Sequence, residues 1–225
     1  SWGQLGNQNI GYYPYQAMIA GVDAYPFDKK NESLAYSQKV YANQNIKWET
    51  TTITDIGADF QFLHRLNVTF DWYNKVTKDI LRGSQVSYLL GLDAPTVNNG
   101  TLENKGIELA VNWNDVIQSG IFKGLEYNVG FYVDRSRNKL IDFGDVEYKN
   151  HGILQEGLPY GQYYMLECIG VFADENEVKD SPKQFTDDTK PGDLKYRDVD
   201  GNGKIDNNDR VAMDGRFPGF EYSVN

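Results

Sequence analysis

The chain has 225 residues, of which 14% are aromatic, yet its mean hydropathy is low at −0.59. Its formal net charge of −10 argues against nucleic acid as a partner, because nucleic-acid binding depends on Lys and Arg side chains that neutralise phosphates. The single cysteine, Cys168, excludes an internal disulfide, and no run of 18 apolar residues is present that would form a membrane helix. Many aromatic residues in a hydrophilic chain are typical of β-strands with one apolar and one polar face.

A long polar stretch, residues 4–45, precedes four segments in which apolar and polar residues alternate. These segments span residues 55–62, 66–73, 107–114 and 125–134. Alternation with a period of two predicts β-strands. Asp, Glu, Asn and Gln recur on one face, so we expect that face to contact water and the opposite face to contact an apolar environment.

Two all-β architectures satisfy this pattern: a soluble sandwich with one face in a core, and a transmembrane barrel with lipid outside and water inside. Strands of about ten residues match a tilted membrane strand, whereas strands of soluble proteins usually have about five or six residues. Three tryptophans near predicted strand ends, Trp48, Trp72 and Trp113, are suited to the aromatic girdles of a barrel. In a sandwich the same residues would lie in the core.

The lengths of the connections favour the barrel. A tight turn around His64 joins the first two strands, and a fairly short segment around Ser119 joins the last two. The connection 81–101 between these pairs is long, and another long connection follows the fourth strand. Short turns that alternate with long loops are typical of outer-membrane barrels, in which the long loops are extracellular. We therefore predict an antiparallel transmembrane β-barrel segment with long extracellular loops.

In such a segment the apolar face points outward to lipid and the polar face lines the interior. The residues predicted to point outward are Ile56, Phe60, Val68, Phe70, Leu109, Val111, Val129 and Phe131. The residues predicted to line the interior are Asp59, Asp71, Glu108, Asn112 and Asn128.

One motif predicts a metal site. Residues 198–209, within a predicted extracellular loop 139–216, read DVDGNGKIDNND and match the calcium loop of EF-hands, although no helix is expected before them. Gly203 stands where that loop turns sharply, and Asp209 takes the twelfth position, which is usually Glu. The alternative is a surface turn rich in Asp, Asn and Gly that holds no metal. The predicted Ca²⁺ ligands, with Lys204 contributing its backbone carbonyl, are Asp198, Asp200, Asn202, Lys204, Asp206 and Asp209.

No catalytic constellation is apparent. The sequence contains neither Gly-x-Ser-x-Gly nor a glycine-rich phosphate loop, and its two histidines, His64 and His151, have no nucleophile at a diagnostic spacing. Acid pairs such as Glu103 and Glu108 are expected by chance among 32 acids. The sequence therefore predicts that the chain is not an enzyme and that its cofactor is a structural Ca²⁺.

Five strings are distributed along nearly the whole chain: SWGQLGNQ at residues 1–8, NQNIKWETT at 43–51, LENKGIEL at 102–109, EGLPYG at 156–161 and PGDLKY at 191–196. In sequence and in order they resemble the C-terminal barrel region of the SusC/RagA family of TonB-dependent transporters of Bacteroidetes. The resemblance implies a barrel of about 22 strands with a plugged lumen, located in the cell outer membrane of a Gram-negative bacterium. Residues 1–225 would be an internal part of that barrel, and we expect the plug domain and the other strands to lie outside this chain.

The resemblance also implies TonB-dependent import of nutrients, usually oligosaccharides and sometimes peptides. The implied partners are a SusD-like surface lipoprotein and the TonB–ExbB–ExbD system, which acts through the plug. The alternative from another class is a secreted, calcium-stabilised β-sandwich that binds glycans or adheres to surfaces.

Overall fold

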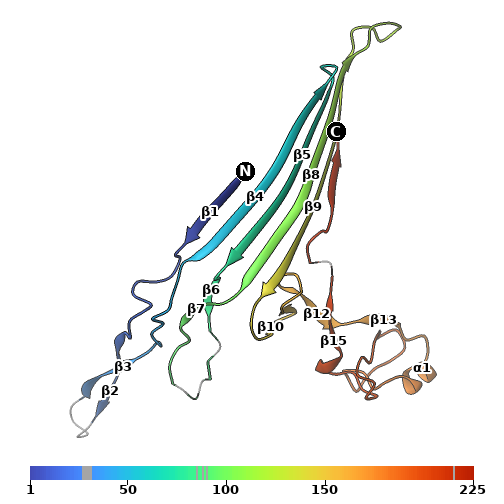
Figure 1. Ribbon diagram of the computed structural model, residues 1–225. Helices are drawn as coiled ribbons and strands as arrows, with labels where there is room; N and C mark the ends of the chain where they lie inside the picture. The colour runs from blue at the N-terminus through green and yellow to red at the C-terminus, as the bar shows by residue number, and fades with distance from the viewer. Residues whose placement is uncertain (27–31, 85, 88, 90, 215) are drawn as a thin grey trace.

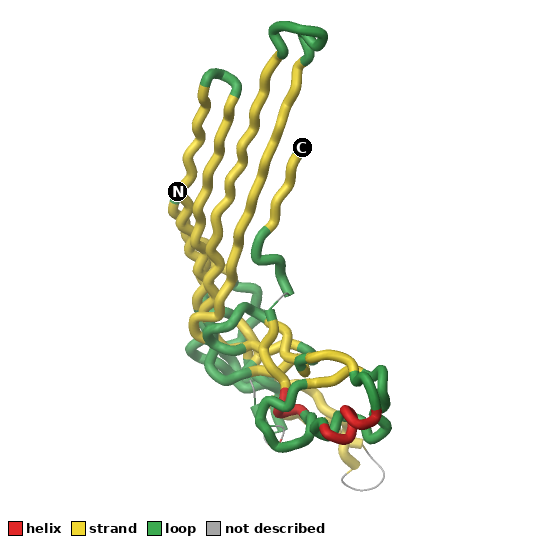
Figure 2. Tube along the Cα trace, turned by 90° about the vertical axis from the view of Figure 1, so that its right-hand side faces the viewer, coloured by secondary structure: helices red, strands yellow, loops and turns green. Residues whose placement is uncertain are grey.

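The computed structural model describes residues 1–26, 32–84, 86–87, 89, 91–214 and 216–225. Six strands form one antiparallel sheet in the order β1, β4, β5, β8, β9 and β16, and they lie side by side in Figures 1 and 2. The predicted all-β, antiparallel fold is therefore confirmed. The strands of this main sheet are β1 (Trp2–Asn7), β4 (Glu49–Phe62), β5 (Leu66–Lys78), β8 (Thr101–Val116), β9 (Glu126–Asp142) and β16 (Glu221–Val224).

The four central strands are longer than the alternating segments that predicted them. β4 begins at Glu49, β8 begins at Thr101 and β9 continues to Asp142. The backbone ladder continues there although polar and charged side chains replace the apolar ones, because strand pairing depends on backbone N–H and C=O groups. The connection predicted at 139–216 accordingly begins only after Asp142, and it contains strands of its own.

The register aligns the apolar positions of neighbouring strands. Val68 of β5 is opposite both Phe60 and Val111, and Val111 is opposite Phe131. Because side chains alternate between the two faces of a strand, all eight residues predicted to point outward share one face, called here the apolar face. The five residues predicted to line the interior share the other, called here the polar face.

Short turns and long connections lie at opposite ends of the main sheet, as Figure 2 shows. The β4–β5 turn has only two residues with left-handed backbone, Leu63 and His64, and Arg65 donates its N–H to the carbonyl of Phe62 at 3.0 Å. The β8–β9 connection, residues 117–125, lies at the same end. The connections before β4, between β5 and β8, and after β9 all lie at the other end, so the predicted alternation is confirmed.

Residues 143–220, called here the long connection, fold into a small unit at the end of β9 (Figure 1). One sheet has the order β10, β11, β12, β15, and a second pairs β13 with β14. The elements of this unit are β10 (Glu147–Lys149), β11 (Gly152–Leu154), β12 (Gln162–Leu166), β13 (Cys168–Val171), α1 (Glu175–Asp180), β14 (Leu194–Tyr196), the 3₁₀ helix η2 (Asn207–Asp209) and β15 (Arg210–Met213).

A small hydrophobic core joins the long connection to the main sheet. Leu140 of β9 is fully buried against Phe143 and Leu154, and Leu102 of β8 packs beside them. Leu102 and Leu140 are directly opposite each other and lie on the polar face. The long connection therefore folds over the polar face at its end, and it extends the ladder, since Leu140 donates to the carbonyl of Leu158 at 2.9 Å.

Two further hairpins lie at the same end: β2 (Ile19–Pro26) with β3 (Glu32–Gln38), and β6 (Leu81–Gly83) with β7 (Thr96–Asn98). Arg82 of β6 donates to the carbonyls of Asn99, at 3.1 Å, and Phe143, at 2.7 Å, and forms an ion pair with the buried Glu147. This guanidinium therefore connects the β5–β8 connection to the long connection. Within the described residues, no helix is long and apolar enough to cross a membrane.

Candidate functional site

The apolar face carries a band of exposed and half-buried apolar side chains with charged residues at both edges. On β8 the band includes Ile107, Leu109, Val111 and Trp113, and it ends at Lys105 on one side and at Asp115 on the other. Lys105 and Asp115 are ten residues apart (115 − 105). At about 3.3 Å per residue and a tilt of about 40°, ten residues correspond to about 25 Å along the membrane normal, which is the height of the apolar band of outer-membrane barrels.

Two of the tryptophans predicted to form girdles lie at the edges of this band. Trp113 is in the row nearest the turns, where its indole N–H donates to the hydroxyl of Tyr127 at 3.4 Å. Trp72 is in the row nearest the long connections, opposite Ile56 and Ile107. The third, Trp48, precedes β4 and packs over Gly6 of β1, outside the ladder.

The polar face carries a row of carboxylates that crosses four strands. Asp71 is opposite Glu108, Glu108 is opposite Asp134, and Asp134 is opposite Glu221. Like charges on directly opposite positions are unfavourable unless water or counterions screen them, so this row requires an aqueous environment. At the next strand, the row is continued by Gly57, which leaves room for the Asp71 carboxylate.

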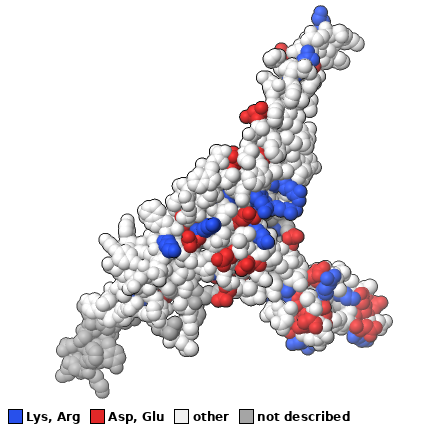
Figure 3. Space-filling view, viewed as in Figure 1, with Lys and Arg blue, Asp and Glu red and all other residues white. Residues whose placement is uncertain are grey.

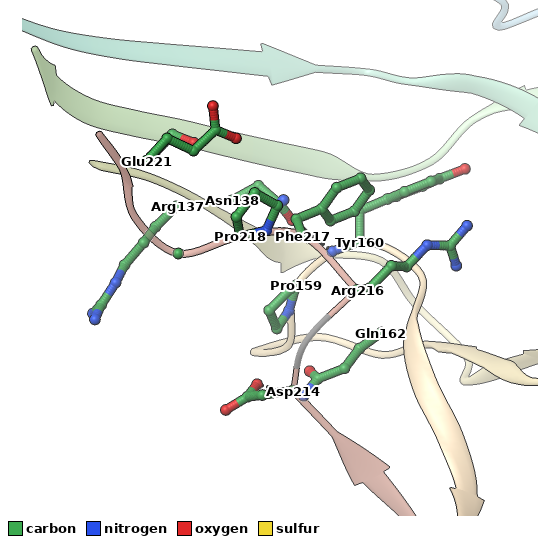
Figure 4. Close-up of a pocket in the computed structure, with 12 residues that line it drawn as sticks. Arg137, Asn138, Pro159, Tyr160, Gln162, Asp214, Arg216, Phe217, Pro218 and Glu221 are labelled. Carbon is green, nitrogen blue, oxygen red and sulfur yellow. Dashed lines mark hydrogen bonds between the residues drawn. The ribbon is translucent and has the colours of Figure 1, made fainter. Parts of the chain in front are cut away.

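A cavity of about 790 Å³ lies beside β9, where the main sheet meets the long connection. Figure 4 shows Tyr160, Phe217 and Gln162 around it. The Gln162 side chain is buried and its amide N–H₂ donates to Asp214 at 2.9 Å, whereas its carbonyl oxygen has no hydrogen-bond partner among the described residues. The cavity thus combines aromatic rings with the polar side chains of Asp214 and Arg216, a combination that suits hydroxyl or amide groups of a ligand.

The predicted calcium loop adopts a compact ring of Asx hydrogen bonds. The Asp198 carboxylate accepts N–H groups from Gly201 at 2.8 Å and from Gly203 at 2.9 Å. Gly203 has a left-handed backbone with φ of +83°, as the sixth position of such a loop requires. Ile205 is buried and its N–H donates to the carbonyl of Lys183 at 2.7 Å, which ties the loop to a neighbouring segment.

Hydrogen bonds lower the pKa of two of the loop's carboxylates. The N–H of Asp206, at 2.7 Å, followed by those of Val199 and Asp200, lowers the pKa of the fully buried Asp209, although burial opposes this shift. An ion pair with Lys204 at 2.8 Å, together with the N–H of Asn208, lowers the pKa of Asp206.

The structure brings three of the six predicted ligands together. Carboxylate oxygens of Asp198, Asp200 and Asp209 lie within 4.8 Å of one another. The other predicted side-chain ligands bond within the loop: Asn202 accepts the N–H of Lys204, and Asp206 pairs with its ammonium group. Asp209 accepts three N–H groups on its two oxygens, and since a carboxylate has about four lone-pair sites, one site stays open for a cation.

The family described as “TonB dependent receptor-like, beta-barrel” matches residues 4–212. The chain belongs to this family. TonB-dependent receptors lie in the outer membrane of Gram-negative bacteria and are transporters, not enzymes, so the predicted localisation and the non-enzymatic class are both confirmed. The alternative of a secreted β-sandwich is wrong, because the family to which the chain belongs is the β-barrel of TonB-dependent receptors.

Similar proteins support the SusC/RagA resemblance. The chain is 29% identical over its whole length to TonB-dependent receptor P3 of Formosa agariphila, and 28% identical over 93% of its length to TonB-dependent receptor SusC of Bacteroides thetaiotaomicron. A structure of the RagAB peptide transporter matches 99% of the chain with a TM-score of 0.71 and 19% identity. The chain spans 23% and 21% of the lengths of the two receptors, and 23% of the RagAB chain.

Sequence reasoning overlooked two charged groups of this receptor segment. The pair of Arg82 and Glu147 joins two connections that are far apart in sequence, and no local pattern reveals it. By contrast, Arg135, Arg137 and Lys139 continue the alternation of β9 with a period of two after Val133. That spacing was a readable signal that the strand continues with basic residues on the apolar face.

Proposed function

We propose that the full-length receptor that contains this chain imports an organic nutrient across the outer membrane by a TonB-dependent mechanism. The observation that carries the proposal is the family match, which covers most of the chain. The main sheet agrees with it, because one face is apolar and suits lipid while the other is polar and suits water. In this proposal the main sheet is a wall between lipid and an aqueous lumen. The import step is a displacement of the plug by TonB, ExbB and ExbD, and no covalent bond is made or broken.

The cargo that we propose is an oligosaccharide or a peptide without net negative charge. The SusC/RagA resemblance implies both classes, and one structurally similar protein is described as a peptide transporter. The carboxylate row of Asp71, Glu108, Asp134 and Glu221 supports the restriction on charge, because these groups would repel an anionic cargo. The cavity at Gln162 offers aromatic rings and polar side chains that suit sugar hydroxyls or peptide N–H groups.

We further propose that a SusD-like surface lipoprotein covers the end of the barrel that carries the long connections. This assigns the range 139–216 to the extracellular side, as the alternation of short turns and long loops predicts. The unit formed by the long connection is held to the β5–β8 connection by Arg82. It would therefore present a defined surface to a lipoprotein partner.

Uptake assays test the import proposal directly. A strain lacking the gene is compared with strains that carry the wild-type gene or a gene without the TonB-contacting segment, using labelled neutral oligosaccharides, acidic oligosaccharides and peptides. We expect uptake of one neutral class to require both the gene and the TonB-contacting segment. Uptake that is independent of the gene for every class would contradict import, and preferential uptake of the acidic class would contradict the proposed charge restriction.

We also propose that the loop at 198–209 binds a structural Ca²⁺. Support comes from the three converging carboxylates, the left-handed Gly203 and the buried Ile205. A bound cation would offset the repulsion among Asp198, Asp200 and Asp209, and would hold the loop against the segment around Lys183. Extracellular sites of this type bind Ca²⁺ with dissociation constants of about 10⁻⁴ to 10⁻³ M.

Calorimetry with the full-length receptor tests this metal proposal. We expect heat of binding with millimolar Ca²⁺ for the wild type, none for the double variant Asp198→Ala/Asp200→Ala, and faster proteolysis near Arg197 in that variant. Asp188→Asn, which removes an exposed acid of the same connection, is the matched control and should bind normally. No heat for the wild type, or equal heat for the double variant, would refute the site.

A further inference from the structure

The apolar face carries a basic cluster, formed by Lys105 of β8 and by Arg135, Arg137 and Lys139 of β9. All four side chains are exposed. Arg135 is opposite Ile107, which is opposite Trp72, at the edge of the apolar band. Lys105 and Arg137 lie together one step closer to the long connection, and Lys139 lies one step beyond them. Figure 3 shows that charged side chains of both signs lie where the long strands meet the loop region, whereas the strands beyond them are mostly uncharged on the visible face.

The charge of this cluster is not balanced by neighbouring acids. Lys105 pairs with Glu103 at 3.0 Å, and Glu103 is also opposite Lys139. Within the described part of the chain, Arg135 and Arg137 form no ion pair. Four bases and one acid therefore share this patch, although the chain as a whole has a net charge of −10.

The cluster also contains a pair of like charges on opposite positions, of which only Lys105 has an acidic partner among the described residues, namely Glu103. Lys105 and Arg137 are directly opposite each other on neighbouring strands. Side chains at such positions are about 5 Å apart, and like charges there are destabilising. A bound anion between them would remove that cost, whereas the carboxylates of the polar face point to the other side of the sheet and cannot.

From this arrangement we infer that the basic cluster binds the phosphate groups of a glycolipid in the outer leaflet of the outer membrane. The apolar band directly below the cluster contacts the acyl chains, so a headgroup phosphate at the band's edge lies at the height of Arg135 and Arg137. Arg suits this role, because its planar guanidinium donates two parallel hydrogen bonds to phosphate oxygens. The inference rests on the proposed orientation, in which the long connections lie outside the cell.

Native mass spectrometry of the full-length receptor in detergent tests the inference, with diphosphorylated lipid A, its fully dephosphorylated form and phosphatidylcholine as separate probes. We expect the wild type to retain diphosphorylated lipid A in preference to both others. The variant Arg135→Gln/Arg137→Gln should retain it about 25-fold less well, because each basic residue near an anionic membrane surface contributes a factor of about five. Equal retention of the phosphorylated and dephosphorylated forms would refute a phosphate site.

Two further variants separate charge from folding. Arg135→Lys/Arg137→Lys should restore most of the retention, since the charge is kept. Lys75→Gln/Lys123→Gln removes two bases elsewhere, one from the polar face and one from the β8–β9 turn, and should retain lipid A like the wild type. If this control loses retention equally, net charge and not the cluster is responsible, and the inference fails.

The source of the phosphate is tested by competition. Inorganic phosphate at millimolar concentration should not displace lipid A from the wild type, because the acyl chains on the apolar band contribute to binding. Displacement by inorganic phosphate would show a free-anion site and overturn the lipid assignment. A cysteine placed at Asp188 and labelled on intact cells tests the orientation separately, and labelling only after the outer membrane is opened would overturn the outer-leaflet assignment.

Discussion

The main sheet and the long connection obtain their stability in different ways. In the sheet, the apolar side chains of Ile56 and Phe60 are 61% and 50% exposed in the isolated chain, since their partner in the membrane is lipid. In the long connection the few buried apolar residues, such as Phe172, Ile153 and Ile205, are almost fully covered by the protein itself. One region therefore uses the bilayer as its apolar solvent, whereas the other builds a small core in water.

This difference explains why the two regions follow different sequence rules. A membrane wall needs one repeating pattern, and backbone pairing on both sides of each strand satisfies its polar groups. A water-exposed unit must instead satisfy its backbone with turns, caps and side chains, as the carboxylates of Asp174 and Asp209 do by accepting backbone N–H groups. Leu140 lies at the junction between the two regions, so it belongs both to the backbone ladder of β9 and to the small core of the long connection.

The largest effect is expected at that junction. Leu140→Ala should destabilise the attachment of the long connection by about 2–5 kcal/mol, because it removes a fully buried side chain and leaves a cavity between Phe143 and Leu154. Hydrogen exchange of residues 143–160 in the full-length receptor measures this opening. Ile141→Ala, at a neighbouring exposed position, is the control, and equal protection in both variants would contradict the role of Leu140.

A comparison of two adjacent positions on β8 tests the assignment of the faces. Val111→Arg should cost about 2–4 kcal/mol of folding free energy in a bilayer, since it places a charge in the middle of the lipid-facing band. Asn112→Arg, one residue further along and on the polar face, should be tolerated. Urea-induced unfolding of the full-length receptor in lipid vesicles measures both costs, and equal costs would refute the assignment.

The contact between connections should be sensitive to Arg82. Arg82→Met should destabilise the end with the long connections by about 1–3 kcal/mol, because Glu147 would remain buried without its guanidinium partner. The second variant, Arg82→Met/Glu147→Met, should recover part of that loss, since no unpaired charge is left. Proteolysis rates of the segment 84–95 report the effect, and a double variant no better than the single one would argue against the ion pair.

The smallest expected effect is a pH dependence of the stability of α1. The N–H of Ala173, at 2.8 Å, and then the ammonium group of Lys195, at 2.9 Å, lower the pKa of Glu177 below its ordinary value of 4.5. A lowered folded pKa stabilises α1 at pH values above about 4.5, and this stabilisation is lost as the pH falls through the folded value. Hydrogen exchange of residues 172–180 should therefore accelerate below pH 4.5 in the wild type and change less in Glu177→Gln. Glu175→Gln should behave like the wild type.

The sequence predicted the strand conformation at the centres of the main-sheet strands but not at their ends. The centres, such as Leu66 to Tyr73, alternate because each side chain contacts either lipid or water. The ends, such as Thr101 to Gly106 and Arg135 to Asp142, do not alternate between apolar and polar residues, so their strand conformation follows from pairing with each other. Similarly, the spacing of Asp198, Asp200 and Gly203 predicted the turn of the loop at 198–209, but it did not reveal that Asp209 is fully buried.

By itself, the sequence determined that this receptor segment has long amphipathic strands, which face is apolar, and at which end the long connections lie. Those properties are local, since they depend on the alternation of side chains within a strand and on the number of residues between strands. Only the tertiary structure decided that Lys105 is opposite Arg137, that Arg82 reaches Glu147 and that Leu140 is covered by the long connection. Each of these contacts joins residues that are far apart in the chain, and they are fixed by the register of backbone hydrogen bonds, which no local pattern encodes.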